Sequence, residues 1–339
     1  MQGRIVLRYK MNLKRKNKYI LILVLILLSN ILFGCKTKTI EEKYSIQINN
    51  GAIAIRNNEN YKIYNLNNGK YENIETDYII IAYDSRSNNF IFNKDGDYKI
   101  QYFGEEIVID DINNIFSPKI SLGGEYLSYF VKDVYLNLKI KDLKKDTLIN
   151  FDSKVSISGE LMDWYDEKSF VYYGIDDNKN NGIFLYNIES NEEKLIYKLD
   201  SGYVEYLKVL DNGVVFIQEK EGKQKTLKII NENGELKEEI NNIVDISDVE
   251  HTEDGIFIIG KVENNNYSIY QYSEGKLKRL VYDFPKIINL EKGLSKDSNG
   301  NILFIGGEEP SIERVYISED GAISQLSDLE GEYYFINFH

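Results

Sequence analysis

The chain contains few residues of the types that bind transition metals or act as nucleophiles. Among its 339 residues there is one cysteine, Cys35, and there are two histidines, His251 and His339. A structural zinc site usually needs four cysteine, histidine or carboxylate ligands, so this composition argues against zinc. His251 stands just before a Thr-Glu-Asp-Gly turn, where we expect an ordinary residue at the end of a strand. We predict no cofactor.

One polar loop has the ligand spacing of a calcium site. Asp176, Asn178 and Asn180 place side-chain oxygens at alternate positions of the segment DDNKNNG, as calcium loops do. The glycine comes one residue later than in the EF-hand pattern, and no glutamate stands at the twelfth position. A hairpin turn without metal explains the segment, so these three residues are weak calcium candidates and we predict no metal site.

No familiar catalytic constellation occurs in the sequence. The G-x-S-x-G motif that places a nucleophilic serine is absent. The many carboxylates leave one enzymatic alternative open, in which a carboxylate pair hydrolyses a glycoside or lactone at the mouth of a channel. The 27 tyrosines could stack on sugars, but their alternation with charged residues favours packing between strands. We name no catalytic residue and favour binding over catalysis.

Cys35 follows a basic segment and then an apolar one. Seven Lys or Arg residues and no acidic residue precede it, and Tyr19–Leu28 is an uninterrupted apolar run of ten. A membrane-spanning helix needs about 20 apolar residues, so this run is nearer the length of a signal-peptide core. The sequence Leu32-Phe33-Gly34-Cys35 resembles the lipobox of bacterial lipoproteins, although Phe33 is bulkier than the residue usual at that position.

The lipobox resemblance implies that Cys35 is acylated, for example with palmitate, and becomes the first mature residue. Two or more acyl chains would anchor the protein stably to the extracytoplasmic face of the bacterial cell membrane. We therefore divide the chain into a signal peptide (1–34), the lipidated Cys35 with a short tether (35–43), and one folded domain (44–339). The residues do not decide whether Met1 or Met11 is the true start. A buried thiol or an uncleaved anchor is the alternative.

The charge distribution bears on partners. Without the seven basic residues that precede Cys35, the formal net charge falls from −13 to −20. So acidic a chain repels phosphate backbones, which argues against nucleic acid as a partner. Acidity of this kind most simply gives a soluble surface.

Short apolar, tyrosine-rich runs repeat along the rest of the chain. The second run of each repeat begins at Gly51, Asn89, Tyr126, Phe170, Val214, Ile256 and Ile302, with spacings of 37 to 46 residues. A third run follows each of these, and turn pairs such as Asn68-Gly69 and Asp320-Gly321 often open a fourth. Four short strands repeated about every 40 residues are typical of β-propeller blades.

The repeat at 163–199 is the clearest copy. Its turn Trp164-Tyr165-Asp166-Glu167-Lys168, followed by FVYYG, GIFLYNIES and EKLIYKL, resembles the W-S-P-D-G-K turn and next three strands of TolB-type propellers. The resemblance weakens towards the first two repeats, the proline of the family is absent from these turns, and tryptophan survives only once. It implies a propeller fold without specifying a ligand.

Seven sets of strands predict an all-β propeller with seven blades, and six or eight blades are the alternatives. The last residues, EYYFINFH, read as one further strand, and we expect Tyr333–Phe338 to close the ring as the inner strand of the first blade. Tyr44–Ile48 competes for that place.

The function expected from these observations is a membrane-anchored binding or scaffold module at the cell surface. Its partner would be an envelope protein or polymer. A structural role in envelope assembly or signalling is a further alternative, which rests on the TolB-type resemblance. The fold alone does not indicate a more specific function.

Overall fold

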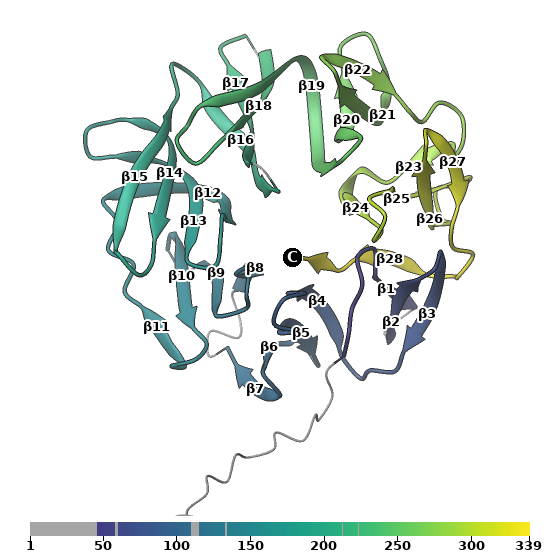
Figure 1. Ribbon diagram of the computed structural model, residues 1–339, viewed down its shortest axis with the longest axis horizontal. Coiled ribbons are helices and arrows are strands. Elements are labelled where there is room, and N and C mark those ends of the chain that lie inside the picture. The colour runs from purple at the N-terminus through teal and green to yellow at the C-terminus, as the bar shows by residue number, and fades with distance from the viewer. Residues whose placement is uncertain (1–45, 58–59, 110–114, 133, 212, 223) are drawn as a thin grey trace, which may run out of the picture. The chain divides into compact units, whose positions relative to one another are not determined.

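The computed structural model describes residues 46–57, 60–109, 115–132, 134–211, 213–222 and 224–339. The predicted signal peptide, Cys35 and the tether lie outside the described residues. The described chain forms a ring of antiparallel sheets around a central channel (Figure 1). The one helix in this part is the short 3-10 segment η1 (Leu290–Lys292), and no helix there is long and apolar enough to cross a membrane.

Seven blades make up the ring, and their strands run in chain order from the channel outward, except that the inner strand of blade 1 comes from the end of the chain. Blades 1 to 4 consist of β28 (Glu332–Phe335), β1 (Ile53–Asn57), β2 (Asn60–Asn67) and β3 (Lys70–Ile74); β4 (Ile79–Tyr83), β5 (Phe90–Lys94), β6 (Asp97–Tyr102) and β7 (Glu105–Val108); β8 (Ile115–Ile120), β9 (Tyr126–Lys132), β10 (Leu136–Asp142) and β11 (Thr147–Ile149); and β12 (Val155–Trp164), β13 (Ser169–Asp176), β14 (Asn181–Asn187) and β15 (Glu192–Lys198). Blades 5 to 7 consist of β16 (Tyr203–Leu210), β17 (Gly213–Lys220), β18 (Gln224–Ile230) and the first part of β19 (Leu236–Thr252); the last part of β19, β20 (Gly255–Val262), β21 (Tyr267–Ser273) and β22 (Lys276–Arg279); and β23 (Ile287–Ile288) with β24 (Leu294–Lys296), β25 (Ile302–Gly307), β26 (Arg314–Glu319) and β27 (Ala322–Gln325). The predicted seven-bladed, all-β fold is confirmed.

The long strand β19 belongs to two blades. Its first half pairs with β18 and its second half with β20, and Ile243 faces both Lys225 and Val262. Blades 5 and 6 therefore form one continuous sheet of seven strands. The sequence did not indicate this, because the predicted fourth strand of one blade and first strand of the next are simply fused without a turn.

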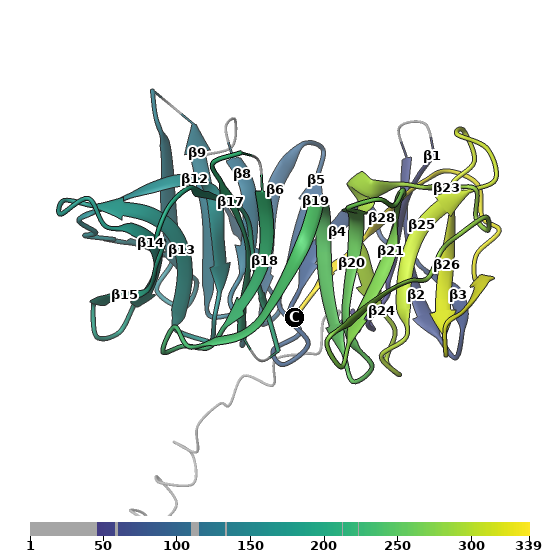
Figure 2. The ribbon, with the colours of Figure 1, turned by 90° about the horizontal axis from the view of Figure 1, so that it is seen from above.

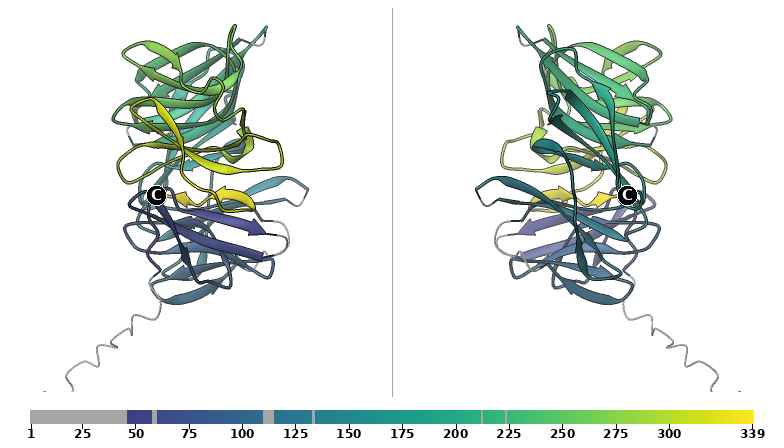
Figure 3. Two further views of the ribbon diagram at one scale, coloured as in Figure 1. Left: turned by 90° about the vertical axis from the view of Figure 1, so that its right-hand side faces the viewer. Right: turned by 90° about the vertical axis from the view of Figure 1, so that its left-hand side faces the viewer.

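The end of the chain closes the ring, although only the first part of the predicted strand Tyr333–Phe338 lies in blade 1. Strand β28 pairs with β1, with Ile53 opposite Phe335 and Ile55 opposite Tyr333, so it is the inner strand of blade 1 (Figure 3). The chain then crosses to blade 2, where β29 (Asn337–Phe338) runs parallel to β4. The competing segment does not form this strand: residues 46–48 are described and are not in a strand.

The core lies between neighbouring blades. Its largest fully buried side chains are aromatic and come mostly from the inner three strands of the blades: Tyr83, Tyr129, Tyr172, Tyr186, Tyr270, Tyr316, Tyr333, Phe90, Phe92, Phe170, Phe216 and Phe304. Ring contacts between blades, such as Tyr126 of blade 3 stacked on Trp164 of blade 4 at 6.1 Å between centroids, pack the blades together. Packing thus explains many of the tyrosines, as expected.

The two ends of the ring differ in what they carry. Turns between first and second strands lie at the lower end in Figure 2, and the connections between blades lie at the upper end together with the turns between second and third strands. The predicted tight turns adopt the expected backbone: Asn68 and Gly69 have φ of 48° and 73°, and Asp320 and Gly321 have φ of 49° and 79°.

Candidate ligand site in the channel mouth

The lower end of the channel opens into a polar cavity of about 650 Å³, which we call the mouth. Ends of inner strands from several blades and the segment 335–339 line it. Its charged side chains are Arg86, Lys119, Asp163, Lys208, Asp211, Asp248, Glu250, Lys292 and Lys296, and His339 also lines it. Cations and carboxylates thus alternate around the mouth of a protein whose overall charge is strongly negative.

A lysine and an aspartate join blades 3, 4 and 5. Lys119 on β8 donates to Asp163 Oδ1 on β12 (2.9 Å) and to the carbonyl oxygen of Met162 (2.9 Å). The N–H of Val209 on β16 donates to the other oxygen of Asp163 (2.7 Å). We call this arrangement the first staple. Asp163 is almost fully buried, and its side chain is only 7% exposed.

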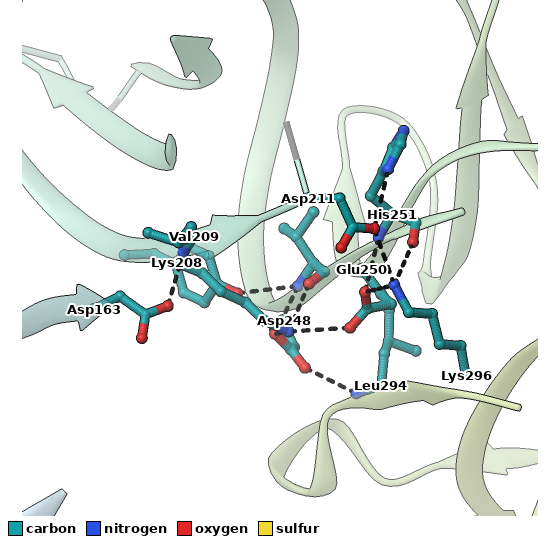
Figure 4. Close-up of polar contacts among 11 residues, drawn as sticks. Asp163, Lys208, Val209, Asp211, Asp248, Glu250, His251, Leu294 and Lys296 are labelled. Carbon is teal, nitrogen blue, oxygen red and sulfur yellow. Dashed lines mark hydrogen bonds and ion pairs between the residues drawn. The ribbon is translucent and has the colours of Figure 1, made fainter. Parts of the chain in front are cut away.

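A second staple repeats this geometry between blades 5, 6 and 7 (Figure 4). Lys208 on β16 donates to Asp248 Oδ1 on β19 (3.0 Å) and to the carbonyl oxygen of Val249 (2.8 Å). The N–H of Leu294 on β24 donates to Asp248 Oδ2 (2.9 Å). Each staple therefore uses the lysine of one blade, the aspartate of the next, and the backbone of the blade after that.

Further ion pairs extend the second staple. Glu250 accepts from Lys208 (3.4 Å) and from Lys296 (3.2 Å), and Lys296 also lies 3.2 Å from Asp211 (Figure 4). His251 Nδ1 lies 3.8 Å from Asp211 at the edge of this group. The tyrosine hydroxyl of Tyr206 donates to Asp248 as well (2.7 Å).

Electrostatics keep both staples charged. Burial alone would raise the pKa of Asp163, but the Lys119 ammonium and the hydrogen bond from Val209 hold that pKa below its usual range. Burial alone would lower the pKa of Lys208, and the carboxylates of Asp248 and Glu250 outweigh it and raise that pKa. Both residues are therefore ionised at neutral pH.

His339 lies beside the first staple. Strand pairing continues to it: its N–H donates to the carbonyl oxygen of Tyr83 (2.9 Å), and its own carbonyl oxygen accepts from Ser85 N–H (2.8 Å). Its Nε2 is buried and has no hydrogen-bond partner among the described residues. Burial lowers the pKa of His339, only partly offset by the charge of Asp163, so the imidazole is neutral at neutral pH.

Solved structures contain this fold. An uncharacterised protein from Listeria monocytogenes EGD-e is similar with 12% identity and a TM-score of 0.53, over 83% of this chain and 92% of that one. A prolyl endopeptidase structure is similar with 12% identity and a TM-score of 0.56, over 75% of this chain but only 42% of that longer one. TolB from Acinetobacter baumannii is also similar, at 13% identity and a TM-score of 0.45 over 81% of this chain and 77% of that one.

These likenesses show the fold alone, because all three identities are low. No protein-family model matches the chain, and no curated protein matches it. Functional arguments must therefore come from the chain's own side chains.

The residues singled out from the sequence lie away from the mouth, except for His339. Asp176, Asn178 and Asn180 form the upper-end turn between β13 and β14. Both oxygens of Asp176 accept from Asn180 (2.7 Å each), and Asn180 Oδ1 accepts from Lys198 (2.8 Å), so hydrogen bonds within the hairpin occupy these oxygens. In the described part of the chain, no group of three or more histidine, cysteine or acidic residues could hold a metal ion. Cys35 lies outside that part.

Sequence reasoning missed both staples, although a signal was present for Lys119, Asp163 and Lys208. Lys119, Asp163, Lys208, Glu250 and Lys296 each stand six or seven positions before the first residue of the next apolar run, in five consecutive repeats. Their signs alternate from blade to blade. Because the same register recurs in every blade, such a series places opposite charges next to one another around the channel.

Proposed function

We propose that the protein is a lipid-anchored binding module on the extracytoplasmic face of the cell membrane, and that an envelope protein binds its upper end. The anchor rests on the lipobox at Cys35. The binding role rests chiefly on one observation, an exposed apolar patch at the upper end of blades 6 and 7. Neither depends on the distant structural likenesses.

The patch consists of Tyr282, Phe284, Ile287 and Ile312, which we call the rim patch. These side chains are 64%, 45%, 36% and 40% exposed. They belong to neighbouring segments: Ile287 pairs with Gly307 on the strand that leads into the turn carrying Ile312, and the ring of Phe284 packs edge-on against the buried Tyr316 of the same blade at 5.4 Å. Apolar side chains gathered in this way mark surfaces that bind other proteins.

The chain's path supports this orientation. The first described residues lead into β1 at the lower end, where Asn50 lines the mouth. Ten residues, 36–45, separate Cys35 from residue 46, and ten residues span at most about 36 Å. An anchor at Cys35 would therefore hold the lower end near the bilayer and leave the rim patch directed away from it.

The arrangement of the mouth favours binding over hydrolysis by a carboxylate pair. Converging carboxylates are present, but lysines pair with Asp163, Asp248, Glu250 and Asp211. A carboxylic acid that protonates a leaving group needs a raised pKa, whereas the pKa of Asp163 is lowered. Its staple stabilises the ionised form, which is the wrong form for a general acid.

Capture from solubilised envelopes tests the rim patch. The full chain carrying both Tyr282→Ala and Phe284→Ala should lose a partner that the wild type recovers, while its melting temperature changes little because both side chains are exposed. Phe103→Ala is the matched control, because Phe103 is an exposed aromatic residue (53%) at the lower end. Equal capture by all three proteins would contradict the assignment of the rim patch.

Fractionation tests the anchor separately. The wild type should enter the detergent phase and incorporate labelled fatty acid, and Cys35→Ser should do neither. A wild type that stays in the aqueous phase, or that takes up label without Cys35, would show that Cys35 is not the attachment site.

A further inference from the structure

The two staples differ in how many of their donors are used. An ammonium group carries three N–H donors. Lys208 has three acceptors, namely Asp248, Glu250 and the carbonyl oxygen of Val249. Lys119 has two acceptors among the described residues, Asp163 and the carbonyl oxygen of Met162. One N–H of Lys119 is therefore left over in a cavity that Lys119 lines.

On the side of the first staple, both oxygens of each of two buried carboxylates already accept hydrogen bonds. Asp163 accepts from Lys119, Val209 N–H and Trp164 N–H. Asp84, which is fully buried, accepts from both the N–H and the hydroxyl of Ser87 and from Gly123 N–H. No oxygen of these two carboxylates lacks a donor, whereas Lys119 has a donor without an acceptor in the described part of the chain.

Two further donors face the same part of the mouth. Arg86 lines the cavity, and its guanidinium is 59% exposed with one carboxylate partner, Glu167, at 3.3 Å. The imidazole of His339 lines it too and has a buried Nε2 without a partner. Two other buried side-chain atoms in the described chain are unpaired, on Asn181 and Gln218, but neither residue lines the mouth. A buried, unpaired polar atom destabilises the fold, and a ligand that pairs with it removes this destabilisation.

We propose that the mouth beside the first staple binds the carboxylate of a small acidic molecule through Lys119, His339 and Arg86. The cavity of about 650 Å³ lies in the usual range for small-molecule sites, roughly 300–1,000 Å³. Lys119, Arg86 and His339 can donate hydrogen bonds to an anion, while the neighbouring carboxylates of Asp163 and Asp84 already accept hydrogen bonds from the protein. This site is distinct from the rim patch, which lies at the opposite end of the ring, so it does not rest on the proposed protein partner.

Because the chain has only two histidines, the NMR signals of their imidazoles can report binding at the site. Full-length protein in detergent, labelled at histidine, would be titrated with glucuronate as a carboxylate probe, glucose as its uncharged counterpart, and inorganic phosphate as another anion. His339→Gln assigns the two imidazoles. Glucuronate should shift the His339 signals saturably and raise the pKa of His339, because a bound anion stabilises the imidazolium beside Lys119, Asp163, Asp84 and Lys208. His251 belongs to the second staple's surroundings and should not respond.

Variants locate the binding. Arg86→Gln should weaken glucuronate binding by about tenfold, the worth of one charge-assisted hydrogen bond, without unfolding the protein, since Arg86 is exposed. Arg56→Gln, an arginine outside the mouth that is 46% exposed, should bind as the wild type does. The proposal is overturned if glucose shifts His339 as glucuronate does, if only phosphate acts, if His251 responds equally, if no probe acts at tens of millimolar, or if Arg86→Gln and Arg56→Gln bind equally well.

Discussion

The two staples show one geometry put to two uses. Both bind a lysine, a buried or half-buried aspartate and a backbone N–H across three consecutive blades. Around the second staple, Glu250, Lys296 and Tyr206 complete a closed network. Beside the first, the corresponding space holds His339 with an unpaired nitrogen. A saturated network stabilises the ring, whereas an incomplete one leaves groups for a ligand.

Removing the closing segment should have the largest effect, because it disturbs both staples through the ring that holds them. Truncation after Glu330 would expose the edges of β1 and β4 and remove Tyr333 and Ile336, which are buried. Each such side chain contributes about 1.5–3 kcal/mol by burial. We expect the melting temperature to collapse or the protein to aggregate. An unchanged melting temperature would show that the ring does not need this segment.

Breaking the second staple should cost nearly as much. In Asp248→Ala, Lys208 and the N–H of Leu294 lose their common acceptor. Because the side chains of Lys208 and Asp248 are 27% and 17% exposed, we expect a loss somewhat below the about 3–5 kcal/mol that is typical of a fully buried pair. Removing the stranded cation as well, in Asp248→Ala with Lys208→Met, should recover part of the loss. Denaturant unfolding measures both.

Asp211→Ala is the control for that experiment. Asp211 is 66% exposed and should contribute less than about 1 kcal/mol to the free energy of unfolding. If Asp248→Ala were no more damaging than Asp211→Ala, the second staple would not be a structural network.

The residue beside the first staple, His339, should have a smaller effect, on how the melting temperature depends on pH. The folded-state pKa of His339 is lowered by burial, so protonation favours the unfolded chain. The stability that the neutral imidazole contributes is fully present above the unfolded pKa of about 6.5 and is lost as pH falls through the lower folded pKa. Melting temperatures between neutral and mildly acidic pH should fall more steeply in the wild type than in His339→Gln. Parallel profiles would contradict the buried, neutral state of His339.

His251 should have the smallest effect. Its Nδ1 is 3.8 Å from Asp211, and both side chains are partly or largely exposed. Exposed pairs of this kind contribute about 0–1 kcal/mol. His251→Gln should therefore unfold at nearly the wild-type denaturant concentration, and a large destabilisation would mean that the network around the second staple extends further than its contacts indicate.

The fold could be predicted from the sequence because its determinants are local and repeated. Runs such as FVYYG and VVFIQ, separated by turn residues, fix the second and third strands of every blade. The leftover strand at Glu332–Phe335 also indicated closure correctly. The fusion of blades 5 and 6 through β19 escaped prediction, since the pair Asn241-Asn242 within Leu236–Thr252 is typical of a turn between strands, yet the strand continues through it with Asn242 at a φ of 65°.

The site was much less predictable, for a physical reason. A staple depends on residues about 40 to 46 positions apart, such as Lys119, Asp163 and Val209, which meet only when three blades pack at the right register. Asp176, Asn178 and Asn180 look most like a site from local spacing, but they lie in a hairpin turn. There, the oxygens of Asp176 accept hydrogen bonds from Asn180, and Asn180 Oδ1 accepts one from Lys198. Local spacing identified a turn, and the alternation of charge between blades was the informative pattern.

A crystal structure of the full chain soaked with glucuronate would test the difference between the two staples most directly. We predict a carboxylate bound against Lys119, Arg86 and His339 Nε2, with Lys208, Asp248 and Glu250 unchanged and no probe at the second staple. A probe seated on Lys208, or a mouth in which His339 Nε2 pairs with another side chain of the protein and admits no glucuronate, would contradict the account.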